Sequence, residues 1–136
     1  MNGTASVSFV AFTVLMLTGA SSFSQPGPDL GKIEYERSCA SCHGISGTGD
    51  GAMRAHLVRP PANLTMLSRW NGGVFPSQGV WETIEGSASV GMGPHGSREM
   101  PVWGQIYGRH LTQPAADWYA AQQIGTLIYY LARIQQ

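Results

Sequence analysis

Residues 39–43 read Cys-Ala-Ser-Cys-His, and this stretch decides the interpretation of the chain. It contains both cysteines of the protein. The C-x-x-C-H pattern is typical of covalent haem c attachment. Two thiols at this spacing can each add to one vinyl group of a porphyrin, and the histidine that follows can place its imidazole on the iron. The pattern therefore predicts one haem c, bound covalently through Cys39 and Cys42, with His43 as an iron ligand.

Three other interpretations use the same residues. C-x-x-C alone also occurs in disulfides and in thioredoxin-type redox pairs, but the latter follow a strand, and no strand pattern precedes Cys39. A zinc site would need two of the four histidines beside the cysteines, and no second pair has ligand spacing. The third interpretation is chance occurrence of a short pattern. The export signal, the glycine-rich loops and the terminal helices described below all favour haem.

The first 28 residues contain none of the sixteen charged side chains. Within them, residues 7–20 are largely apolar and are followed by small polar residues, as in a signal peptide. We therefore expect a cleaved signal peptide over residues 1–24, a linker over 25–28 and a periplasmic domain over 29–136. An uncleaved membrane anchor is the alternative, although the apolar run is shorter than the roughly 20 residues that span a bilayer.

Composition indicates one small globular domain. The chain has 136 residues, of which 43% are hydrophobic, and its eight basic and eight acidic residues balance. A neutral chain has no basic field for nucleic acid, so we expect no nucleic-acid partner. Contact with a membrane is expected only if the N-terminal segment stays uncleaved.

Helices are expected at both ends of this domain. Asp29 is a suitable N-cap for a helix that runs to about Ser41. At the other end, Thr112 or Gln113 can cap a helix with Pro114 in its first turn. That helix is amphipathic, because apolar residues recur at steps of three and four to the C-terminus. These residues are Trp118, Ala121, Ile124, Leu127, Ile128, Leu131 and Ile134.

Residues 44–108 contain thirteen glycines and five prolines, which predicts loops with only two short helical pieces. One piece begins at Asn63, has Leu64, Leu67 and Trp70 on one side and ends just after Trp70. The other piece is capped by Ser77 and ends at Gly86. No strand pattern is present, so the fold class is all-α. Loop glycines bury no side chains of their own, and a bound cofactor would supply the missing core.

Met100 is the candidate for the sixth iron ligand. It follows His43 by 57 positions, which is enough chain to pass around the haem edge. Pro101 comes next and restricts the local backbone. A methionine thioether and an imidazole are an established axial pair in electron-transferring haem proteins.

Other side chains compete for this position. Met53 is close to His43 in sequence and Met66 falls in a short helix, so both are expected to be structural. Met92, between glycines, is the second choice. His95 leaves open an iron with two histidine ligands, although a surface role is the simpler expectation for it.

Several further stretches, in the same order, resemble class I c-type cytochromes, and among them the bacterial monohaem type related to the cytochrome subunits of oxidases and dehydrogenases. They are Gly31 with Tyr35, residues 39–44, 47–51, 60–65, 98–104 and 127–131. The resemblance implies that the first and last helices cross, with short helices and long glycine-rich loops around one haem c. It also implies that Gly31 lies against Leu127, that Tyr35 meets Tyr130, and that the carbonyl of Pro61 bonds the proximal imidazole, with Pro60 as the less favoured carrier.

The resemblance implies a non-enzymatic carrier of single electrons between redox proteins, namely a dehydrogenase, reductase or terminal oxidase. An apolar wall around the haem is expected from Leu64, Leu67, Trp81, Ile84 and Trp103, with Trp103 as the best candidate for direct contact. Three alternatives stay open: a haem peroxidase or small-molecule sensor with a labile sixth ligand, a fixed haem subunit of an oxidase or dehydrogenase complex, and an exported protein without haem.

Overall fold

The computed structural model describes residues 27–88 and 99–136. The expected signal peptide, Met92 and His95 lie outside these residues. Within them the chain is helical and has no strand, as predicted. The elements are α1 (Leu30–Ser38), α2 (Ala40–His43), the 3-10 helices η1 (Ala52–His56) and η2 (Leu64–Met66), α3 (Leu67–Trp70), α4 (Ser77–Glu85), α5 (Trp103–Ile106) and α6 (Ala115–Arg133).

Helix α1 begins where the sequence predicts and ends earlier. The side chain of Asp29 accepts a hydrogen bond from the backbone amide of Lys32, 3.1 Å away, which confirms the predicted cap. The helix ends at Ser38 rather than near Ser41, because the φ of Cys39 is −115°, which is far from the φ of about −63° in an α-helix. The cysteine motif therefore begins at a bend and continues on α2.

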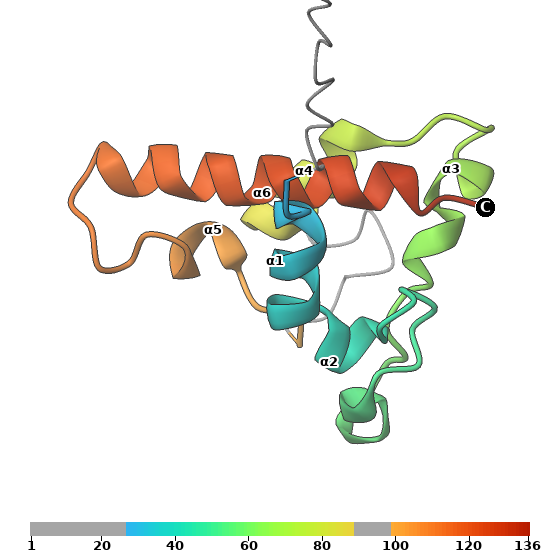
Figure 1. The fold of residues 1–136 in the computed structure, drawn as a ribbon. Coiled ribbons are helices and arrows are strands. Elements are labelled where there is room, and N and C mark those ends of the chain that lie inside the picture. The colour runs from blue at the N-terminus through green and yellow to red at the C-terminus, as the bar shows by residue number, and fades with distance from the viewer. Residues whose placement is uncertain (1–26, 89–98) are drawn as a thin grey trace, which may run out of the picture.

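Helix α6 forms the long side of the molecule, and α1 runs across it (Figure 1). Its N-cap is Pro114, not Thr112 or Gln113. Its buried residues recur at helical spacing and are Ala120, Ile124, Leu127, Tyr130 and Leu131. Trp118, expected on this face, is 66% exposed. α4 and α5 also pack against α6, so this helix organises the core.

The crossing of α1 and α6 depends on a missing side chain. A Cβ at Gly31 would collide with the backbone carbonyl of Thr126 and would lie 2.8 Å from the Cβ of Tyr130. The predicted close approach is present, and the nearest atoms belong to Thr126 and Tyr130, on either side of the expected Leu127 in the sequence. The predicted meeting of Tyr35 and Tyr130 is confirmed, because their ring centroids are 5.1 Å apart.

The loop region contains more helix than predicted. The piece that begins at Asn63 is divided into η2 and α3, and its Trp70 is 60% exposed rather than on a buried side. Pro76, not Ser77, is the N-cap of α4. Gly86 ends α4 as predicted, in the left-handed conformation with a φ of 104°. η1 and α5 were not predicted at all.

Candidate haem-binding site

A cavity of about 270 Å³ opens between the cysteine motif, helix α4 and the segment that follows residue 98. The cysteine motif lines this cavity with Cys39, Cys42 and His43. A segment distant in sequence lines it with Met100 and Trp103. Four of the five predicted wall residues also line it: Leu64, Leu67, Ile84 and Trp103. Trp81 does not; it packs, half-buried, against the core. The loops thus leave space in the interior, as expected of a cofactor site.

His43 is buried and held by a backbone carbonyl. Only 6% of it is exposed, and its Nδ1 lies 3.0 Å from the carbonyl oxygen of Ala62. With the proton on Nδ1, this bond fixes the ring and makes Nε2 the nitrogen with a metal-ligating lone pair. Burial lowers the pKa of His43, which favours the neutral imidazole that metals bind.

The prediction that Pro61 supplies this carbonyl is wrong by one residue. The carbonyl oxygen of Pro61 faces Gly49, where a Cβ would come within 2.5 Å of it. The carbonyl of Ala62, the next residue, is the one within hydrogen-bond distance of the imidazole. Pro61 still lines the cavity with its ring atoms, beside Pro60.

Both thiols of the motif lie at the cavity, half-buried and without a disulfide between them. Burial raises the pKa of Cys39 to about 12, and the negative charge of Glu34 acts in the same direction. Residues 27–88 and 99–136 contain no cluster of three or more His, Cys, Asp or Glu that could hold a metal ion. Two thiols and one imidazole on a single wall fit a haem that is attached covalently and ligated from the same turn.

Met100 lines the cavity, and the other two methionines of the described residues do not. Met53 is 43% exposed and, as expected, is not at the haem cavity. Met66 is half-buried in η2 and does not line the cavity. The structure thus brings His43 and Met100 to one cavity, while Met92 and His95 lie outside the residues that it describes.

Several cavity residues were missed from the sequence. Val80 lines the cavity beside Ile84, four positions later on α4, and helical spacing could have indicated it. Leu57 and Arg59 also line the cavity, but they belong to an irregular segment. Such a segment has no periodic pattern from which inward-facing side chains could be predicted.

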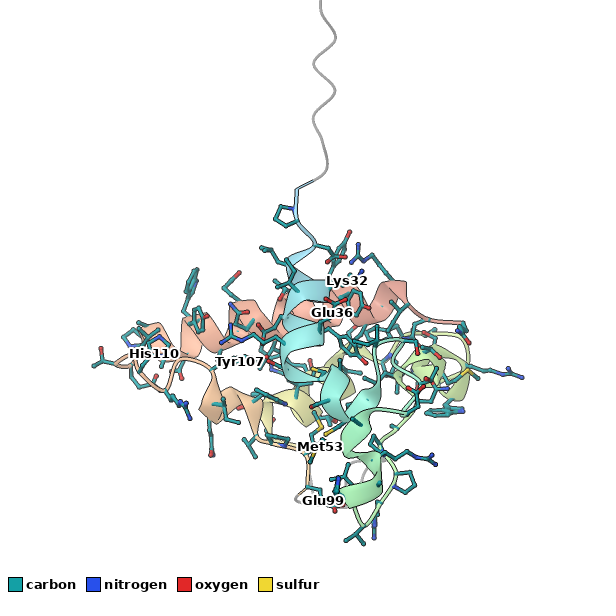
Figure 2. All side chains as sticks on the ribbon, turned by 60° about the horizontal axis from the view of Figure 1, so that its bottom comes forward. Lys32, Glu36, Met53, Glu99, Tyr107 and His110 are labelled. Atoms are coloured by element: carbon teal, nitrogen blue, oxygen red, sulfur yellow. The ribbon has the colours of Figure 1, made fainter. Side chains whose placement is uncertain are left out.

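Glu99 ties the Met100 segment to the opposite loop. Its Oε1 accepts a hydrogen bond from the backbone amide of Val58, 2.6 Å away, and its Oε2 accepts one from the amide of Arg59, 3.3 Å away. Figure 2 shows Glu99 at the end of the molecule away from α6. Since Glu99 precedes Met100 directly, these bonds restrict where the thioether can lie.

Replacing Glu99→Ala is expected to loosen this segment, because it removes both hydrogen bonds that join the segment to Val58 and Arg59. The ferric holoprotein should then bind added cyanide or imidazole about tenfold faster, measured by stopped-flow absorbance. Glu82→Ala is the matched control, because the Glu82 carboxylate bonds only within α4, to Gln78, and does not line the cavity. Equal binding rates for the two variants would contradict this role for Glu99.

Comparisons with known proteins agree with the site. A family model described as Cytochrome c matches residues 28–135, which is most of the chain. No curated protein and no solved structure in the comparison matches significantly. No helix within the described ranges is long and apolar enough to cross a membrane. Members of the matched family bind haem c covalently, and Cys39 and Cys42 have the spacing that attachment requires. The chain therefore belongs to the cytochrome c family and is a haem c-type electron carrier.

Proposed function

We propose that the protein is a periplasmic carrier of single electrons whose haem iron is ligated by His43 and Met100. The observation that supports this most directly is that His43 and Met100, 57 positions apart, line the cavity at which both motif thiols lie. The haem, when bound, supplies the Fe(III)/Fe(II) couple. The role of the polypeptide is to hold the imidazole of His43 and the thioether of Met100 in place as ligands and to exclude other molecules from the iron.

Retention of both ligands keeps oxygen and peroxide from binding, which separates a carrier from a peroxidase or a sensor. The bond from His43 to the Ala62 carbonyl orients the imidazole. The Met100 thioether favours the ferrous state, so the potential is higher than with two histidines. Leu64, Leu67 and Ile84 provide apolar surface that limits water near a centre whose charge changes at each turnover.

The partners that we propose are a redox protein that donates the electron and another that accepts it. Encounters between such proteins are small and transient, and the net charge of zero gives this chain no strong long-range attraction. The apolar segment 7–20, followed by small polar residues, supports export to the periplasm.

The test is the visible spectrum of the exported protein before and after extraction with acid-acetone. We expect haem to stay with the polypeptide and the native ferric protein to show the weak near-red band of a methionine–iron bond. The control is a variant with Cys39→Ala and Cys42→Ala, from which any haem should be extracted. Extractable haem in the wild type would contradict covalent attachment, and rapid carbon monoxide or cyanide binding to the native protein would favour the sensor or peroxidase alternative.

A further inference from the structure

A buried carboxylate lies beside the haem cavity, and no role described so far uses it. Glu34, on α1, is 8% exposed. Its Oε1 accepts two hydrogen bonds, from the hydroxyl of Tyr107 at 2.6 Å and from the hydroxyl of Ser38 at 2.5 Å. An ionised carboxylate only accepts, so two hydroxyl donors directed at one oxygen are the arrangement that the charged form favours.

No side chain of residues 27–88 and 99–136 forms an ion pair with this carboxylate. In the described part of the chain the ion pairs are Lys32–Glu36 and Asp29–Arg133, and neither includes Glu34. A buried carboxylate without a cationic partner is unfavourable for folding unless hydrogen bonds or a nearby positive centre offset its desolvation. The two hydroxyls offset part of this cost, and no ion pair among the described residues supplies a positive centre for Glu34.

The carboxylate lies one layer of side chains behind the cavity wall. Ser38, which donates to Glu34, lines the cavity, and so does Cys39. The other donor is Tyr107, the residue that follows α5, and its hydroxyl reaches Glu34 on α1 (Figure 2). Its ring centroid is 5.4 Å from that of Trp103, which also lines the cavity. The negative charge of Glu34 contributes to the raised pKa of the Cys39 thiol.

We propose that the Glu34 carboxylate sets the reduction potential, because its buried negative charge stabilises the ferric haem relative to the ferrous haem. One electron from the donor protein would reduce Fe(III) to Fe(II), with no bond formed or broken. A haem held by Cys39, Cys42 and His43 would supply a positive centre near this carboxylate in its ferric form and would lose that charge on reduction. The inference deepens the proposed electron-carrier function and rests on it. Glu34 acts through the electric field and touches no reacting atom.

The experiment compares midpoint potentials of holoproteins at pH 7. Glu34→Gln keeps an oxygen that can accept from Tyr107 and Ser38 and removes the charge. We expect the equilibrium constant for reduction to rise about tenfold, which for one electron is a potential about 59 mV higher. Glu36→Gln is the matched control: it removes the same charge from the same helix, where the Glu36 side chain is 42% exposed and pairs with Lys32. Water screens that charge, so the potential should stay close to wild type.

A second variant separates charge from packing. Glu34→Asp keeps the charge but shortens the side chain and disturbs both hydrogen bonds, so its potential should stay nearer to wild type than that of Glu34→Gln. The proposal is overturned if Glu34→Gln shifts the potential no more than Glu36→Gln, or if Glu34→Asp raises it as much as Glu34→Gln does. The near-red band, recorded for each variant, tests the Met100 ligand separately. Loss of that ligand would lower the potential, in the direction opposite to the one proposed here.

Discussion

The Met100→Ala variant is expected to have a midpoint potential lower than wild type by roughly 0.1 V or more, since axial ligands set haem potentials over a range of about 0.8 V. The thioether stabilises ferrous iron, and water or an open position in its place favours the ferric state. The near-red band should disappear at the same time. A redox titration followed by visible absorbance measures both effects on one sample.

Met53→Ala is the matched control for this prediction. It removes the same thioether from a residue that is 43% exposed in η1 and does not line the cavity, so neither the band nor the potential should change. An unchanged band in Met100→Ala would instead assign the sixth position to another methionine, and Met92→Ala would test that assignment. Absence of the band from the wild type would point to His95, which His95→Ala would test.

The site was predictable where the ligands are adjacent in sequence. The C-x-x-C-H pattern places two thiols and an imidazole within about one helical turn, so residues close in sequence are also close in space. Cys39, Cys42 and His43 do line one cavity. The capping of α1 by Asp29 is likewise a local interaction, over three residues. In each case the partners are too close in the chain for the rest of the fold to alter the outcome.

Errors arose where the geometry depends on distant segments. The carbonyl that faces His43 belongs to Ala62 rather than Pro61, and irregular backbone has no period from which that register could be read. Trp118 fits the apolar spacing of α6 but is 66% exposed, whereas Ala120, two positions later, is buried. η1 and α5 are too short for a periodic pattern to reveal.

The buried Glu34–Tyr107 pair shows the limit most clearly. The two residues are 73 positions apart, and a glutamate on a short helix is expected at the surface. α1 turns Glu34 inward because its neighbour Tyr35, on the same turn, is buried against α6. Only the packing of α1 on α6 and the position of α5 bring the hydroxyl of Tyr107 to this carboxylate.

The Gly31→Ala variant is expected to lose about 3 kcal/mol of the free energy of unfolding, the upper part of the range for overpacked interiors. Helix propensity predicts the opposite sign, since alanine is favoured over glycine within a helix by about 0.5–1 kcal/mol. Packing should dominate, because the new methyl would meet the backbone carbonyl of Thr126, which cannot rotate away as a side chain can. Urea unfolding of the ferric holoprotein, followed by helical circular dichroism, measures the change.

Gly125→Ala provides the control from the other helix of the same crossing. Gly125 lies within α6, and a Cβ built there meets no atom within 4 Å. The propensity term then acts alone, and this variant should be more stable than wild type by about 0.5–1 kcal/mol. Opposite signs for the two substitutions would show that the crossing depends on contact between backbones. A stabilised Gly31→Ala variant would mean that α1 and α6 lie further apart in solution than in this structure, and that the haem motif following α1 is positioned by the loops instead.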